Sequence, residues 1–175
     1  MDHPFQEFKR AQQARSDKLR ELHAYWLRMH RDGRPGPRTG FDATEVPRLL
    51  SSLLLGDIEP EPFRVYFRLV GTRVADFSRL DFSGFYLDAL DYGERDSVEW
   101  LDCYRHVFST GNGIIGVNRV TWESDAPLEY EFAILPLERN GHPAGSFVAI
   151  EDYDSIAKAD IPAMPPVTVF QRLKD

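Results

Sequence analysis

The stretch from Gly113 to Tyr153 decides the fold, because it contains the segments IIGVNRVTWE (residues 114–123), LEYEFAI (128–134) and SFVAI (146–150). In the first two segments, β-branched and aromatic residues alternate with charged ones at a period of two, which is typical of half-buried strands. The cluster SDAP at 124–127 predicts a turn, and Asn140-Gly141 predicts a tight hairpin. The stretch therefore predicts three consecutive antiparallel strands.

Two carboxylates, Glu129 and Glu131, lie two positions apart on the second of these strands. Residues at this spacing share one face of a strand. We expect this face to be exposed to solvent, so we assign the pair no catalytic or binding role.

The N-terminal segment predicts a long helix over residues 5–31, since it contains no Gly or Pro and is rich in helix-forming residues. A narrow heptad stripe is strongest toward its end. We expect this helix either to pack on the open face of the strands or to pair with its copy in a homodimer. The candidates for the dimer interface are Leu19, Leu22, Trp26 and Met29.

Further elements follow between the N-terminal helix and Gly113. Asp42 and Glu45 form a candidate capping box for a short helix through Leu50. Residues 53–59 form a short apolar strand candidate, and residues 63–70 alternate as a full strand. Residues 73–77 allow one or two helical turns, and residues 96–110 predict a second long helix. Trp100, Leu101, Tyr104, Val107 and Phe108 form the expected buried face of that helix, centred on Tyr104. The expected organisation is an N-terminal helix and loop at 1–40, one domain at 41–153 and a C-terminal tail at 154–175.

The chain resembles a bacterial, alphaproteobacterial-type family of PAS-like proteins over residues 19 to 153. The resemblance is carried by Tyr25-Trp26, FRVYFRLVGT at 63–72, DFSG at 81–84 and Leu135-Pro136-Leu137. It implies an α+β, PAS-like fold: an antiparallel five-stranded sheet with helices on one face and an additional N-terminal helix. It also implies a sensory or interaction module, and it carries no catalytic residues.

Aromatic side chains are the candidates for lining a ligand pocket between the sheet and the helices, although an ordinary filled core is the alternative for them. They are Phe67, Phe77, Phe82, Tyr104, Phe108, Tyr130 and Phe132.

Cofactor and metal sites are not expected. His106 lies about 200° from Tyr104 on a helical period, which disfavours haem ligation, and Cys103 lacks the sequence context of a flavin-adduct cysteine. The other histidines show no metal-binding spacing. We therefore expect a colourless protein.

Charge and composition limit the possible partners and compartments. Residues 1–40 hold nine Lys or Arg and five Asp or Glu, so the rest of the chain carries most of the negative charge behind the total of −7. An acidic body disfavours nucleic-acid binding. The single cysteine, the lack of a long apolar run and the lack of a signal peptide predict a cytoplasmic protein that does not bind a membrane.

Two functional classes fit these observations. The favoured one is a stand-alone sensory or protein-interaction module without catalytic activity, which binds a small ligand or a signalling partner. The alternative is a small enzyme on another curved-sheet α+β scaffold, isomerase- or dehydratase-like, with a buried carboxylate as base. A carboxylate with a strongly raised pKa in a closed cavity would favour the alternative.

Overall fold

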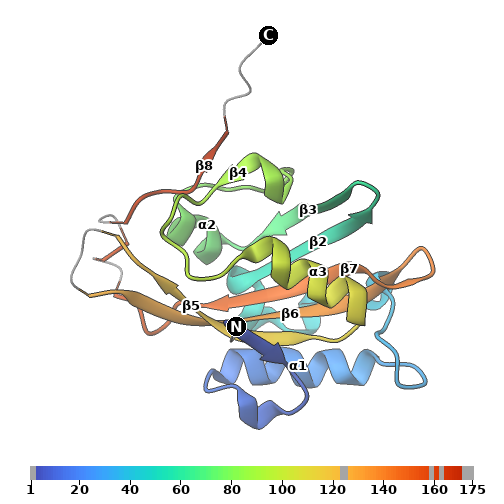
Figure 1. Cartoon of the computed structure of the whole chain (residues 1–175). Coiled ribbons are helices and arrows are strands. Elements are labelled where there is room, and N and C mark those ends of the chain that lie inside the picture. Colours follow the sequence, from blue (N-terminus) through green and yellow to red (C-terminus); the bar gives the residue numbers. More distant parts are fainter. Residues whose placement is uncertain (1–2, 123–125, 158–159, 162–163, 171–175) are drawn as a thin grey trace.

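The computed structural model describes residues 3–122, 126–157, 160–161 and 164–170, and its centre is an antiparallel sheet with helices on both faces (Figure 1). The sheet has six strands in the order β1-β5-β6-β7-β2-β3. Their bounds are Phe5–Glu7 (β1), Leu53–Pro60 (β2), Phe63–Val70 (β3), Ile114–Val120 (β5), Leu128–Arg139 (β6) and His142–Asp152 (β7). The predicted antiparallel sheet is thus confirmed, with β1 as a strand beyond the expected five.

The three consecutive strands predicted from residues 114–150 are β5, β6 and β7. Asn140 and Gly141 form the predicted hairpin turn with φ values of 54° and 78°, the left-handed conformation that such turns require. The turn predicted at 124–127 includes residues 124 and 125, which lie outside the described residues. Glu129 is exposed as expected and pairs with Arg119, but Glu131 is largely covered because its carboxylate accepts the backbone N–H groups of Arg15 and Ser16.

The prediction of one continuous helix from Phe5 is wrong. Residues 5–7 instead form β1, which pairs with β5 at the sheet edge, and a 3₁₀ helix follows at Ala11–Gln13. The Gln13 side chain accepts the backbone N–H groups of Lys9 and Arg10 and thereby fixes a turn. The helix α1 (Asp17–Met29) begins only where the Ser16 hydroxyl accepts the N–H of Leu19.

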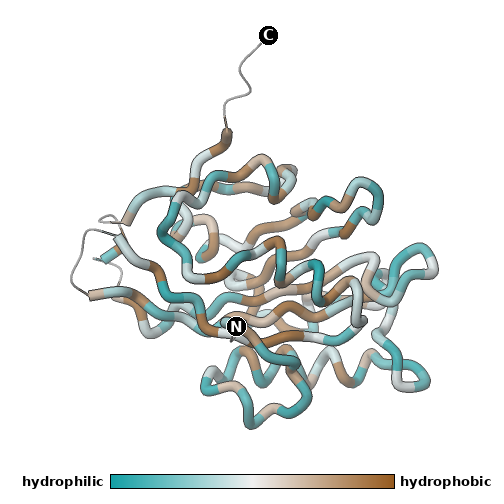
Figure 2. Tube along the Cα trace, viewed as in Figure 1, coloured by the Kyte–Doolittle hydropathy of each residue, from teal (hydrophilic) through white to brown (hydrophobic). Residues whose placement is uncertain are grey.

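On the outer face of the sheet, α1 packs together with 3₁₀ helices at Arg38–Gly40, Ala43–Glu45 and Pro47–Ser52. The 3₁₀ helices at Ala43–Glu45 and Pro47–Ser52 lie where a short helix through Leu50 was predicted. The Asp42 side chain caps the helix at Ala43–Glu45, because it accepts the backbone N–H of Thr44. The apolar side of α1 faces the sheet (Figure 2).

The candidates for a dimer interface are buried in this outer core of their own chain. They are Leu19, Leu22, Trp26 and Met29. Trp26 is only 5% exposed, and its indole Nε1–H donates to the carbonyl of Pro136 at 2.7 Å. The stripe therefore packs on the sheet, the first of the two alternatives, and it is not available as a dimer seam in this conformation.

The inner face is covered by α2 (Thr72–Ser78), α3 (Trp100–Thr110), a 3₁₀ helix at Leu87–Ala89 and the short pair β4 (Leu90–Asp91) and β8 (Thr168–Val169). Tyr104 faces the sheet and is buried, so the predicted phase of α3 is confirmed at its centre. At its edge the prediction is wrong for Leu101, which is 38% exposed.

The segment after residue 153 is not a free tail where the structure describes it. Ile156, Met164 and Val167 are buried in the inner core, and β8 pairs with β4. The N-terminal helix likewise shares a core with the sheet, so α1 and the described part of residues 154–170 both pack on the central sheet or its inner core.

Candidate functional site

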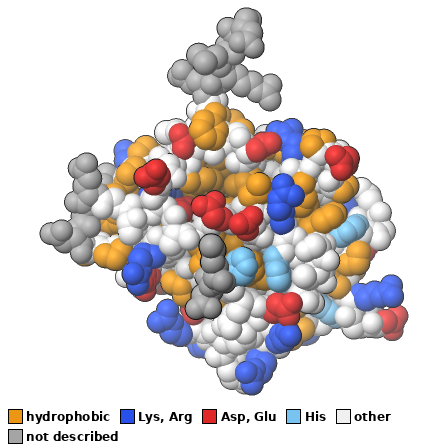
Figure 3. All heavy atoms as spheres, in the orientation of Figure 1, with side chains coloured by type: hydrophobic (Ala, Val, Ile, Leu, Met, Phe, Trp, Pro, Cys, Tyr) orange, Lys and Arg blue, Asp and Glu red, His pale blue; other side chains and the backbone are white. Residues whose placement is uncertain are grey.

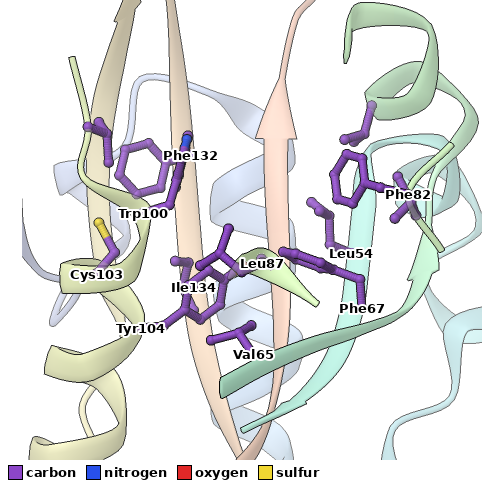
Figure 4. Close-up of a cluster of buried hydrophobic side chains, with 14 of the residues drawn as sticks. Leu54, Val65, Phe67, Phe82, Leu87, Trp100, Cys103, Tyr104, Phe132 and Ile134 are labelled. Atoms are coloured by element: carbon purple, nitrogen blue, oxygen red, sulfur yellow. The ribbon is translucent and has the colours of Figure 1, made fainter. Parts of the chain in front are cut away.

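The aromatic residues proposed to line a pocket do gather in the inner core. Phe67, Phe77, Phe82, Tyr104, Tyr130 and Phe132 are buried there, and Phe108 is partly buried against them. Figure 4 shows side chains of α3 pointing toward those of the strands, among them Trp100 and Tyr104.

These rings contact one another. The ring centroids of Phe67 and Phe82 are 4.9 Å apart, and those of Phe77 and Tyr130 are 5.3 Å apart. Both pairs are edge-to-face, an arrangement typical of a packed interior. The aromatic residues therefore pack against one another as parts of the inner core.

A buried ion pair lies at the margin of the inner core, just before α3. The Arg95 and Asp96 side chains are 4% and 5% exposed, and Arg95 Nε lies 3.5 Å from Asp96 Oδ1. The second carboxylate oxygen, Oδ2, accepts the indole N–H of Trp100 at 2.8 Å, and Arg95 Nη1 donates to the carbonyl of Pro165 at 2.6 Å. Arg95 Nε and Asp96 Oδ1 have no hydrogen-bond partner among the described residues. Buried polar atoms are nearly always hydrogen-bonded, so this donor and this acceptor, which face each other only as an ion pair, retain unused hydrogen-bonding capacity.

Glu151, near the end of β7, brings a second carboxylate to the same region. Burial raises the pKa of its carboxyl to about 8, the neighbouring Asp96 charge adds to this, and Arg95 opposes it. Glu151 as a whole residue is half-buried, and its carboxylate accepts a hydrogen bond from the Tyr153 hydroxyl. Glu151 is therefore mainly protonated near neutral pH.

Aromatic and amide groups complete the polar cluster, which we define as Arg95, Asp96, Asn118, Tyr130, Glu151 and Tyr153. Asn118 is fully buried and donates through Nδ2 to the Tyr130 hydroxyl at 3.0 Å, while its Oδ1 accepts the N–H of Ser97. The Tyr153 ring stacks on Phe77 at 4.0 Å. The polar groups thus lie between aromatic rings, where hydrogen bonds and charges act strongly.

Sequence reasoning missed the charged members of this cluster. Glu151 had a usable signal, because the period of two that places Phe147 and Ala149 on the inner face continues to it. Asp96 was predicted only as the first residue of the long helix at 96–110, whereas α3 begins at Trp100 and leaves Asp96 in the preceding loop. Arg95 precedes α3 in a loop without periodicity, so no pattern indicated its burial.

The two residues considered for cofactors have structural surroundings. Cys103 is fully buried, and burial raises the pKa of its thiol far above the ordinary value, which keeps it protonated. His106 is 33% exposed at its side chain, and the Phe5 ring of β1 packs edge-on against it at 5.3 Å. No group of three metal-ligating side chains that could hold a metal ion occurs among the described residues.

The surface carries its charges unevenly. On the face shown in Figure 3, acidic side chains gather near the centre, and basic ones lie along the lower edge, where Figure 1 shows α1.

In the described ranges, no helix is both long and apolar enough to cross a membrane.

An antiparallel sheet whose inner face is covered by short helices and one longer helix, inserted between the β2–β3 pair and the three strands β5, β6 and β7, defines the class of PAS-like domains. The sequence model of a PAS domain family matches residues 14–150. The chain belongs to this PAS domain family. The alternative scaffold of isomerases and dehydratases is therefore wrong as the fold.

Solved structures similar to the chain include a Rhodobacter sphaeroides LOV protein, with 15% identity and a TM-score of 0.45 over 70% of this chain and 74% of that one. Another is an RNA-binding light-oxygen-voltage receptor, with 12% identity and a TM-score of 0.45 over 73% of this chain. The match spans 39% of that receptor. A comparison with curated protein sequences found no match.

Proposed function

We propose that the chain is a sensory PAS module that binds a small, neutral, hydrogen-bonding ligand at the polar cluster. The observation that carries this proposal is the buried pair of unused atoms, Arg95 Nε as donor and Asp96 Oδ1 as acceptor. Membership of a PAS domain family supports a sensory role. A cytoplasmic location and a signalling partner fit this role and stay expectations.

The charge of the cluster favours a neutral ligand. Arg95 and Asp96 compensate each other, and Glu151 is mainly protonated because its pKa is raised to about 8. An ionic ligand would bring an uncompensated charge into a site that excludes most water, which is costly. A neutral group that accepts from Arg95 Nε and donates to Asp96 Oδ1 would satisfy both atoms without this cost.

Binding fits the site better than catalysis does. Glu151 is the type of carboxylate that the enzyme alternative requires, but its carboxylate is engaged by Tyr153 and lies near the Arg95–Asp96 pair. The buried thiol of Cys103 stays protonated and is a poor nucleophile. These contacts support recognition, and we assign no reaction to them.

A thermal-shift screen with neutral amides, lactams and ureas tests the proposal. Compounds that stabilise the wild-type chain should not stabilise Asp96→Asn, which alters the unused acceptor. They should still stabilise Asp102→Asn, a matched control because Asp102 is exposed on the first turn of α3. Hits that stabilise both variants equally, or a screen without any hit specific for the wild type, would contradict the proposal.

A further inference from the structure

A cavity of about 300 Å³ lies at one end of the sheet, away from the polar cluster. Three parts of the fold meet there: the end of β2, the β6–β7 turn and the C-terminal end of α3, which Figure 1 shows on the same side of the molecule. The volume is in the range of small-ligand pockets. Its wall combines apolar side chains with charged and polar ones: Ile58, Pro60 and Phe108, and Glu59, Arg139 and His142.

Arg139, at the end of β6, supplies a cation to this wall. Its Nε lies 3.5 Å from Oδ1 of Asp57, whose side chain is only 4% exposed, and the other oxygen of Asp57 accepts from Arg68. Two arginines thus share one buried carboxylate, and the group carries a net positive charge. No hydrogen bond from the Arg139 guanidinium is found in the part of the chain that the structure describes. The buried Asp57 therefore holds a guanidinium whose donors are unused.

Glu59, near the end of β2, supplies an anion to the same wall. Its Oε1 accepts the Tyr86 hydroxyl at 2.8 Å, and Oε2 has no hydrogen-bond partner among the described residues. The neighbouring Arg64 is engaged by Asp88 at 2.8 Å. Glu59 and Arg139 thus line one cavity with opposite charges, and within the described ranges they form no ion pair with each other.

An aromatic stack forms the third side of the cavity. The His142 ring lies parallel to that of Phe108, with ring centroids 4.0 Å apart. His142 Nδ1 accepts the N–H of Ala144 at 3.0 Å, so the neutral ring carries its proton on Nε2 and can donate it to an anion. Phe108 joins the buried Ile58 and the Pro60 ring as the apolar part of the wall.

We propose that this cavity binds a free apolar α-amino acid in its zwitterionic form. Its carboxylate pairs with the Arg139 guanidinium, its ammonium with Glu59, and its side chain packs on Ile58 and Phe108. Arginine binds a carboxylate through two parallel hydrogen bonds, which the unused donors of Arg139 allow. A ligand with a single charge would leave one of the two protein charges desolvated and unpaired, which is costly. The site does not depend on ligand binding at the polar cluster.

Isothermal titration calorimetry of the full-length wild type with L-leucine and L-phenylalanine tests the proposal. Two analogues of leucine isolate its charges, since 4-methylpentanoate lacks the ammonium and 3-methylbutylamine lacks the carboxylate. Each analogue should bind about tenfold more weakly than leucine or less tightly still, because one protein charge then stays unpaired. If the wild type binds neither amino acid, or binds leucine and both analogues equally, the proposal is wrong.

Variants then locate the site. Arg139→Gln and Glu59→Gln should each weaken leucine binding by about tenfold or more. The control Arg119→Gln removes an exposed arginine of β5 and should bind like the wild type. Arg139→Lys keeps the charge beside Asp57 if Arg139→Gln does not fold, and it should still weaken binding because the forked guanidinium is lost. Asp96→Asn should leave leucine binding unchanged, whereas a loss in that variant would place the amino acid at the polar cluster and overturn the proposal.

Discussion

Arg95 Nε lies 3.5 Å from Asp96 Oδ1, and neither atom has a hydrogen-bond partner among the described residues, although both side chains are at least nine-tenths buried. Breaking such a pair on one side leaves an uncompensated charge in the interior. The pair therefore constrains what can bind beside it, and it connects the inner core through Arg95 to the C-terminal segment.

Trp26 tests whether the outer core belongs to a single chain. Trp26→Ala should reduce the free energy of unfolding by about 3–5 kcal/mol, because a buried indole and its hydrogen bond to Pro136 are lost. Leu27→Ala is the control, since Leu27 is 48% exposed and should change stability by about 0.5 kcal/mol or less. Urea unfolding measures both. A Trp26→Ala chain that keeps its stability but loses a dimer would restore the heptad stripe as an interface.

Glu151 should make stability decrease as pH rises. Its pKa is raised in the folded chain to about 8, so between the unfolded value and this value the folded state binds the extra proton. The unfolding free energy then decreases by at most about 1.4 kcal/mol per pH unit over that window and levels off above it. Urea unfolding from pH 5 to 9 should show this slope in the wild type and in the exposed control Glu129→Gln, but not in Glu151→Gln. Equal slopes in all three chains would refute it.

His23 should act in the opposite direction. Burial lowers its pKa, and this outweighs the hydrogen bond from Nε2–H to the Phe8 carbonyl at 3.1 Å. The unfolded state therefore takes up the proton more readily, and stability is lost as pH falls below about 6.5, the ordinary histidine value. His23→Phe should remove this loss, while His142→Gln, at the hairpin turn, should keep it. If the free energy of unfolding of His23→Phe still decreases at acidic pH as it does in the wild type, another group causes the loss.

Local patterns could predict much of the fold. The alternation in residues 114–134 and the Asn140-Gly141 turn depend on interactions close in sequence, and both are confirmed in β5, β6 and the hairpin. The start of α1 could not be predicted in this way. Residues 5–16 have good helix propensity, but pairing of β1 with β5 and binding of Arg15 and Ser16 to Glu131 are contacts more than a hundred residues apart.

The candidate site was less predictable than the fold, for the same reason. Aromatic residues could be assigned to the inner face from periodicity, yet the structure shows them filling it. The charged pair lies in a loop, and its burial depends on Pro165 and on the strands it contacts. Distant contacts of this kind leave no mark in a local sequence pattern.

The most direct test of the polar cluster as a ligand site is the indole N–H signal of Trp100 in an NMR spectrum of the ¹⁵N-labelled chain. This N–H donates to Asp96 Oδ2 at 2.8 Å and reports on the cluster, whereas that of Trp26 donates to Pro136 on the outer face and serves as an internal control. The best compound from the thermal-shift screen should shift the Trp100 signal in a saturable manner, leave the Trp26 signal in place and lose this effect in Asp96→Asn. Saturable binding that leaves the Trp100 signal unmoved, or that moves the Trp26 signal instead, would contradict the polar cluster as the sensing site.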